Sequence, residues 1–217
     1  MQLEPEISYK HTNDWDTAKQ WLSELPDLAA FDFEAASIYS DEDRAEFKRQ
    51  LEEDTLTVTE QIEVNAKLNS DALSHPYYTV PTHLSVGWSD KDAFVIVMDN
   101  DDIRFKVIDW LVTTDITQIW HNFLYDGKII YFWSQGQQPK NIEDTALFAK
   151  CLLNHVDTWK ANVQLKQLMG YRYGSWAVSS DYFDLKQIYN EKLIRYAAID
   201  ACATYALWEE INKQLEG

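Results

Sequence analysis

The sequence predicts an α/β domain in which helices pack on a mixed central β-sheet. Short apolar runs at residues 28–34, 82–89 and 93–98 have the length and composition of buried strands. A fourth short run at 116–121 is followed mainly by segments with helical periodicity. Strands that first follow one another and then alternate with helices are typical of a sheet covered by helices.

The helix expected first along the chain covers residues 13–25. Asn13 has a side chain suited to an N-cap, the apolar residues that follow recur on one face, and Pro26 ends the helix. An Asp-Lys-Asp segment at 90–92 is expected to join the second and third strands as a hairpin. Further helices are expected over 103–112, 126–134, 143–154, 161–169 and 190–215.

The chain has 217 residues, which suffice for one domain with a sizeable core, and we expect residues 1–217 to form that single domain. Residues 40–75 stand apart because they are rich in charge and poor in large apolar side chains. They fit a solvated helix, a helical hairpin or a mobile excursion. We expect an exposed insertion without chemistry, and the alternative is a segment that grips substrate or a partner.

The composition narrows the class of protein. A net charge of −17 disfavours a protein that coats nucleic acid, since such proteins are usually basic, but it suits a site that holds divalent cations. The N-terminus lacks the apolar core of a signal peptide, and no apolar run reaches the roughly 18 residues of a membrane span. We therefore expect a cytoplasmic protein without membrane contact. The aromatic-rich chain shows no exposed apolar stripe, which favours a monomer.

The two cysteines, Cys151 and Cys202, both lie in apolar helical patterns. Their spacing indicates neither a zinc site nor a disulfide framework. We expect two buried free thiols in a reducing compartment.

Two acidic residues end the first apolar run, in the segment Phe31-Asp32-Phe33-Glu34. Residues i and i+2 of a strand face the same side, so both carboxylates project together while both phenylalanines face the opposite core. Carboxylates this close repel one another unless a cation lies between them, and oxygen ligands suit Mg²⁺ or Mn²⁺. In so acidic a chain the spacing alone also fits an ordinary solvated strand end.

Two further acidic residues lie in helical segments. Asp126 ends the segment HNFLYD, where it either serves a site or caps the following helix. Tyr196 and Asp200 are four residues apart in an apolar helix, so they lie on one helical face. A buried carboxylate without a partner is costly, which predicts a metal, a proton or a base beside Asp200 unless it lies at the edge of the apolar face.

In this order the segments FDFE, HNFLYD and YAAID resemble the exonuclease motifs of the proofreading domain of family A (polymerase I type) DNA polymerases. That domain belongs to the DnaQ-like, ribonuclease H-like superfamily. The histidine-bearing subgroup has a histidine five residues before the last aspartate, where this chain has Arg195. Tyr196 occupies the tyrosine position instead, so the chain resembles the tyrosine-bearing (DEDDy) subgroup. The segments Glu143-Asp144-Thr145 and ANVQLKQLMGYR resemble two further helices of the family. The resemblance covers about residues 28–39 and 82–213.

The resemblance implies a ribonuclease H-like fold and a 3′–5′ exonuclease that trims single-stranded DNA 3′ ends to nucleoside 5′-monophosphates in replication proofreading or repair. It implies two divalent ions, Mg²⁺ or Mn²⁺, and Tyr196 as the group that orients the attacking water. The chain stops about where a polymerase would begin, so a separate DNA polymerase subunit or domain is a candidate partner. The implied metal ligands are Asp32, Glu34, Asp126 and Asp200. The implied substrate contacts are Ala35, Ile38, Asn122 and Tyr125.

Three other interpretations stay open. An RNase D-like exoribonuclease shares the tyrosine-type motifs, although such enzymes usually carry extra helical domains. A catalytically inactive scaffold or partner-binding domain is disfavoured because all four acids and the tyrosine are present. An acidic mimic of DNA would use the net charge directly but would leave the ordered motifs unexplained.

Overall fold

The computed structural model describes residues 6–53, 55–69, 76–152, 163–174 and 185–215, and the structural statements below concern these ranges. Six strands form one mixed sheet in the order β1-β4-β3-β2-β5-β6. The central β4, β3 and β2 are antiparallel, whereas β1, β5 and β6 pair in parallel with their neighbours. The strands are β1 (Ser8–Thr12), β2 (Leu28–Ser37), β3 (Thr79–Gly87), β4 (Asp92–Val97), β5 (Thr117–Trp120) and β6 (Ile142–Asp144).

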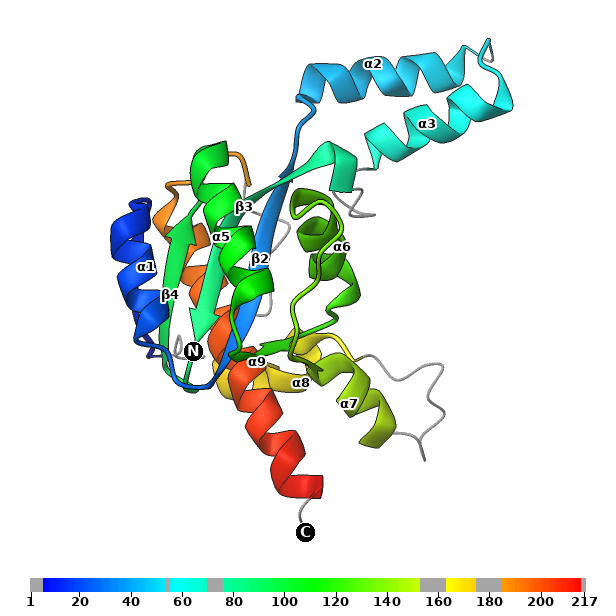
Figure 1. Ribbon diagram of the computed structural model, residues 1–217. Helices are drawn as coiled ribbons and strands as arrows, with labels where there is room; N and C mark the ends of the chain where they lie inside the picture. The colour runs from blue at the N-terminus through cyan, green and yellow to red at the C-terminus, as the bar shows by residue number, and fades with distance from the viewer. Residues whose placement is uncertain (1–5, 54, 70–75, 153–162, 175–184, 216–217) are drawn as a thin grey trace.

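Helices cover both faces of this sheet (Figure 1), which confirms the predicted α/β fold. On one face lie α1 (Trp15–Ser23), α5 (Asp101–Thr113) and α6 (Leu124–Trp133). On the other lie α7 (Thr145–Leu152), α8 (Leu165–Tyr173) and α9 (Glu191–Leu215). The four expected strands are all present, but the edge strands β1 and β6 were not predicted, because their short polar sequences carry no apolar run.

The N-terminal cap of α1 differs from the prediction by one residue. Asp14, not Asn13, is the N-cap, and its carboxylate accepts a hydrogen bond from the backbone N–H of Thr17 at 2.8 Å. The Asn13 amide instead donates to the Asp99 carboxylate. Both residue types cap helices well, so local sequence could not separate them.

The two faces of β2 have opposite character. Phe31 and Phe33 are buried against α1, α5 and α6, and both rings lie 5.6 Å from the ring of Trp120, centroid to centroid. Asp32 and Glu34 therefore project from the other face, toward α9, which packs across β2 and β3. The prediction that the two carboxylates share a face away from the phenylalanines is confirmed.

Gly87 ends β3 directly beneath α9. A Cβ atom at this position would lie 2.9 Å from the carbonyl carbon of Ala201 and 3.0 Å from the nitrogen of Cys202, both backbone atoms. Since backbone cannot rotate aside, we expect Gly87→Ala to lower the free energy of unfolding by about 1–3 kcal/mol, the usual cost of overpacking. Urea denaturation followed by circular dichroism measures it, and an unchanged midpoint would show that α9 can shift freely.

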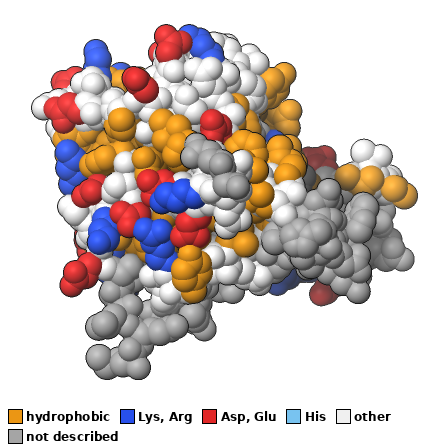
Figure 2. All heavy atoms as spheres, turned by 90° about the horizontal axis from the view of Figure 1, so that it is seen from below, with side chains coloured by type: hydrophobic (Ala, Val, Ile, Leu, Met, Phe, Trp, Pro, Cys, Tyr) orange, Lys and Arg blue, Asp and Glu red, His pale blue; other side chains and the backbone are white. Residues whose placement is uncertain are grey.

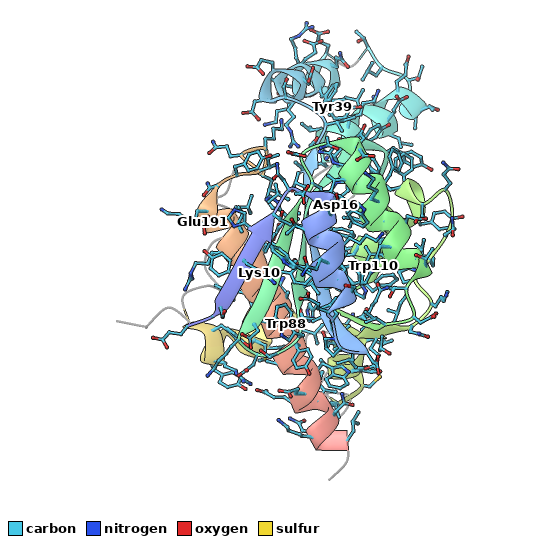
Figure 3. All side chains as sticks on the ribbon, turned by 60° about the vertical axis from the view of Figure 1, so that its left-hand side comes forward. Lys10, Asp16, Tyr39, Trp88, Trp110 and Glu191 are labelled. Carbon is cyan, nitrogen blue, oxygen red and sulfur yellow. The ribbon has the colours of Figure 1, made fainter. Side chains whose placement is uncertain are left out.

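The charged segment forms a helical hairpin, one of the three arrangements compatible with its sequence. Helices α2 (Asp41–Glu52) and α3 (Val58–Leu68) project beyond the end of the sheet (Figure 1), and both begin with a capping box. Of their described residues only Val64 is buried, so the pair is largely solvated. Tyr39 lies at the base of the pair (Figure 3), with its ring 5.0 Å from that of Phe47.

The surface mixes both signs of charge. On the face shown in Figure 2, Lys and Arg side chains lie beside Asp and Glu, with apolar patches between them. No helix in the described ranges is long and apolar enough to cross a membrane. Cys202 is buried as predicted, but Cys151 is exposed, because it lies on the side of α7 away from the buried Ala149.

Candidate functional site

The site begins on β2, where the chain presents Asp32 and Glu34 toward α9. A β-bulge follows at once, because the register with β3 shifts between Glu34 and Ala35. Bulges redirect a strand and recur beside functional sites. The bulge therefore changes the direction of β2 directly after its two acidic side chains.

Helix α9 supplies Tyr196 and Asp200 from consecutive turns of its apolar face. Both side chains are nearly buried, with about 7 % of each residue exposed. One carboxylate oxygen from each of Asp32, Glu34 and Asp200 lies within 4.8 Å of the others. Strand alternation and helical periodicity thus bring together acids that are more than 160 residues apart in the chain.

Helix α6 supplies Asp126, through a turn that Asp144 fixes. The Asp144 carboxylate accepts hydrogen bonds from the backbone N–H groups of Asn122 and Phe123, each at 3.0 Å. Asn122 adopts a left-handed backbone conformation with φ of 62°, which asparagine tolerates better than most residues. Asp126 itself is buried within the first turn of α6, where its carboxylate accepts a hydrogen bond from the backbone of Phe33.

These elements enclose a cavity of about 630 Å³. Seven of the nine predicted site residues line it, while Ala35 and Ile38 do not. Ala35 is buried in β2, and Ile38 is half-exposed just beyond the strand. The seven lining residues are Asp32, Glu34, Asn122, Tyr125, Asp126, Tyr196 and Asp200.

The cavity also contains a cation that sequence reasoning missed. Lys166, from α8, donates a hydrogen bond to the Tyr196 hydroxyl, and its ammonium nitrogen lies 4.5 Å from the centre of that ring. Its positive charge lowers the pKa of both Asp32 and Glu34. A single lysine beside Leu165 in a helical segment is typical of a solvated position, so no local signal indicated this contact.

Burial and mutual repulsion dominate the electrostatics of the acids. Burial, followed by the charge of Asp200, raises the pKa of Asp32 and Glu34 well above the usual range despite Lys166. Burial also raises the pKa of Asp126 to about 8. One buried oxygen of Asp126, Oδ1, has no hydrogen-bond partner among the residues that the structure describes. An oxygen-only set of repelling carboxylates with an unpaired oxygen fits a hard divalent cation such as Mg²⁺ or Mn²⁺.

The raised pKa values predict how stability depends on pH without metal. Carboxyl groups with a folded pKa above the unfolded value of about 4 stabilise the fold at low pH and lose that contribution as pH rises through the folded pKa. The melting temperature in EDTA should therefore fall between pH 5 and pH 9, and Mn²⁺ should restore it most at high pH. Differential scanning fluorimetry measures both trends. Asp126→Asn should flatten the curve, and a melting temperature that rises with pH would contradict the prediction.

Comparison with known families assigns the chain to a family. A family model described as 3′–5′ exonuclease matches residues 74–216, and this range includes Asp126, Tyr196 and Asp200. This chain belongs to that 3′–5′ exonuclease family. The match begins after β2, so it is the structure that brings Asp32 and Glu34 into one cavity with Asp126, Tyr196 and Asp200.

Several solved structures that share this fold are distant from the chain in sequence. Brucella melitensis NrnC with bound Mg²⁺ is 15 % identical, over 99 % of this exonuclease and 83 % of that chain, with a TM-score of 0.55. The catalytic core of Trypanosoma brucei RRP6 is 10 % identical, over 97 % of this exonuclease and 48 % of that chain, with a TM-score of 0.59. Escherichia coli RNase D is described as an exoribonuclease involved in structured RNA processing. It is 13 % identical, over 97 % of this exonuclease and 46 % of that chain, with a TM-score of 0.55. No curated protein sequence matches the exonuclease significantly. At such identities the likeness concerns the fold, which is the predicted ribonuclease H-like one.

Proposed function

We propose that this exonuclease hydrolyses the 3′-terminal phosphodiester bond of single-stranded DNA in a reaction that depends on divalent metal ions. The observation that carries the proposal is the cluster of Asp32, Glu34 and Asp200, with one oxygen of each within 4.8 Å of the others. Water would attack phosphorus, the bond from phosphorus to the 3′ oxygen would break, and the products would be a nucleoside 5′-monophosphate and a shortened strand with a free 3′ hydroxyl.

The acids would hold two ions, Mg²⁺ or Mn²⁺, with Asp126 completing the set from α6. When bound, such ions make water a nucleophile near neutral pH and stabilise the leaving oxygen. Tyr196 would orient the attacking water. Burial and the negative charges around its hydroxyl raise its pKa, so it stays protonated and donates a hydrogen bond instead of accepting a proton.

The remaining predicted residues would contact the terminal nucleotide. Asn122 and Tyr125 line the same cavity from the start of α6, beside the acids. Ile38 exposes about half of its side chain beyond the end of β2, where an apolar group can face a base. Ala35 is buried directly after Glu34, so only its backbone is placed to approach the nucleotide.

RNA is the second candidate substrate, because Escherichia coli RNase D, which shares this fold, is an exoribonuclease. The four acids and Tyr196 would act on the scissile phosphate and the attacking water, which DNA and RNA substrates share, so they fit either nucleic acid. The two candidates differ in substrate but share the same metal site and the same scissile bond.

A labelled-strand assay tests the reaction and its substrate together. DNA and RNA oligonucleotides of the same sequence, each labelled at the 5′ end, are incubated with Mg²⁺ or Mn²⁺. We expect a ladder that shortens from the 3′ end, faster on DNA, and absent with EDTA. Faster cleavage of RNA would favour the second candidate. No cleavage of either strand, together with no Mn²⁺ binding by calorimetry, would favour an inactive scaffold.

A further inference from the structure

A second groove, also of about 630 Å³, lies along the outer side of α6 and beside the short 3-10 helix η1 (Pro76–Tyr78). Its walls carry aromatic rings that are open to solvent, with 69 % of Tyr77 and 55 % of Tyr131 exposed. The rings of Tyr77 and Phe132 meet edge to face, with centroids 4.9 Å apart. Soluble proteins seldom leave several large rings together in water without a ligand.

The charge of this groove is unusual for the chain. The sequence carries 36 acidic against 19 basic residues, yet none of the groove's lining residues in the described ranges is Asp or Glu. Lys128 supplies a positive charge there. A polyanion repelled by most of this protein would meet no acid in the groove itself. Flat rings beside a cation are the usual features of sites that bind single-stranded nucleic acid.

The groove continues the cavity along one stripe of α6. Tyr125, Lys128 and Phe132 are spaced i, i+3 and i+7, so their side chains follow one another on the same face of the helix. Tyr125 lines the cavity that holds the acids, whereas Lys128 and Phe132 line the groove. A strand whose 3′ end lies among the carboxylates can therefore follow α6 into the groove.

We propose that this groove binds the upstream nucleotides of the substrate, with bases stacked on Tyr77, Tyr131 and Phe132 and with Lys128 facing the phosphates. The inference rests on the proposed exonuclease function and adds a preference for substrate length. The seven helical steps from Tyr125 to Phe132 span about 10 Å. A dinucleotide, at roughly 3.4 Å per stacked nucleotide, is too short for that path, whereas an octamer covers it.

Kinetics on two substrate lengths test the groove. For Tyr131→Ala, kcat/KM on an octanucleotide should fall by about tenfold, the cost of losing a stacked base. The value on a dinucleotide should stay at the wild-type level. Tyr131→Phe keeps the ring and should behave like wild type on both substrates. Tyr171→Ala removes an even more exposed ring, from α8, and serves as the control. Equal losses on both lengths, or no loss on either, would overturn the proposal.

Binding of a labelled octanucleotide, followed by fluorescence anisotropy in EDTA, separates the groove from the chemistry. Binding about tenfold weaker for Tyr131→Ala supports the proposal that the groove binds nucleotides. This holds even if the wild-type protein cleaves neither substrate, because the lack of cleavage would count against the proposed function alone. Unchanged binding would overturn the proposal that the groove binds the upstream nucleotides. Sedimentation adds a last check, because a wild-type dimer that Tyr131→Ala converts to a monomer would make this face an interface between copies and overturn the proposal.

Discussion

Asp32→Asn should abolish cleavage and stabilise the metal-free protein. The asparagine keeps the shape of the side chain but removes one ligand charge from the cluster of Asp32, Glu34 and Asp200. Losing several kcal/mol of transition-state stabilisation lowers the rate by about a hundredfold or more. Stability should change in the opposite direction, because burial and three neighbouring acids disfavour the ionised form of Asp32. Without metal, a gain of about 1 kcal/mol would raise the melting temperature by about 2–4 °C.

Two measurements on the same preparation decide this prediction. The labelled-strand assay with Mg²⁺ gives the rate, and scanning fluorimetry in EDTA at pH 8 gives the melting temperature. Asp16→Asn is the matched control, since Asp16 is an exposed acid on α1 (Figure 3), in the layer across the sheet from α9. It should leave both quantities at wild-type values. An Asp32→Asn protein that cleaves normally would show that Asp32 is not needed for the reaction. One that melts earlier than wild type in EDTA would show that the acids do not destabilise the metal-free protein.

The acids could be predicted because their placement depends on local periodicity. Strand alternation alone puts Asp32 and Glu34 on one face, and the spacing of Tyr196 and Asp200 alone puts them on one side of α9. The resemblance then supplied what local patterns cannot, namely that these pairs and Asp126 meet at one site. The structure confirms that they line one cavity.

Sequence reasoning identified the segments that contain Lys166 and Asp144 as similar to family helices but missed their contacts, which join residues distant along the chain. Lys166 meets Tyr196 across 30 residues, and the Asp144 carboxylate reaches the start of α6 across more than 20. Neither contact leaves a periodic signal, because the lysine occupies an ordinary helical position and the aspartate ends a three-residue strand.

The hairpin of α2 and α3 shows a different limit. The spacings of Ser40 to Asp43 and of Thr57 to Glu60 are capping-box patterns, and both boxes form. They are local signals that could have favoured two helices over a mobile excursion. High charge and few apolar side chains nevertheless left the arrangement open, because such a segment buries too little surface for its sequence to determine how it packs.

Lys166→Met should separate metal binding from turnover. The ammonium group partly neutralises Asp32 and Glu34, so it competes electrostatically with any cation that these acids bind. Replacing it with a neutral side chain of similar length should tighten Mn²⁺ binding by about tenfold, because it removes a positive charge that acts on both acids in the same cavity. Turnover should nevertheless fall by about tenfold, because the Tyr196 hydroxyl loses the donor that holds it in place.

Calorimetric titration with Mn²⁺ gives the affinity, and kcat at saturating Mn²⁺ gives the turnover. Lys166→Arg keeps the charge and the donor, so both quantities should stay close to wild type. Lys150→Met removes the charge of a more exposed lysine that lines the same cavity, and its effects should be much smaller. Weaker Mn²⁺ binding in Lys166→Met would mean that the lysine supports the metal site instead of competing with it. Unchanged turnover would mean that the hydrogen bond between Tyr196 and Asp200 is enough to hold the Tyr196 hydroxyl in place.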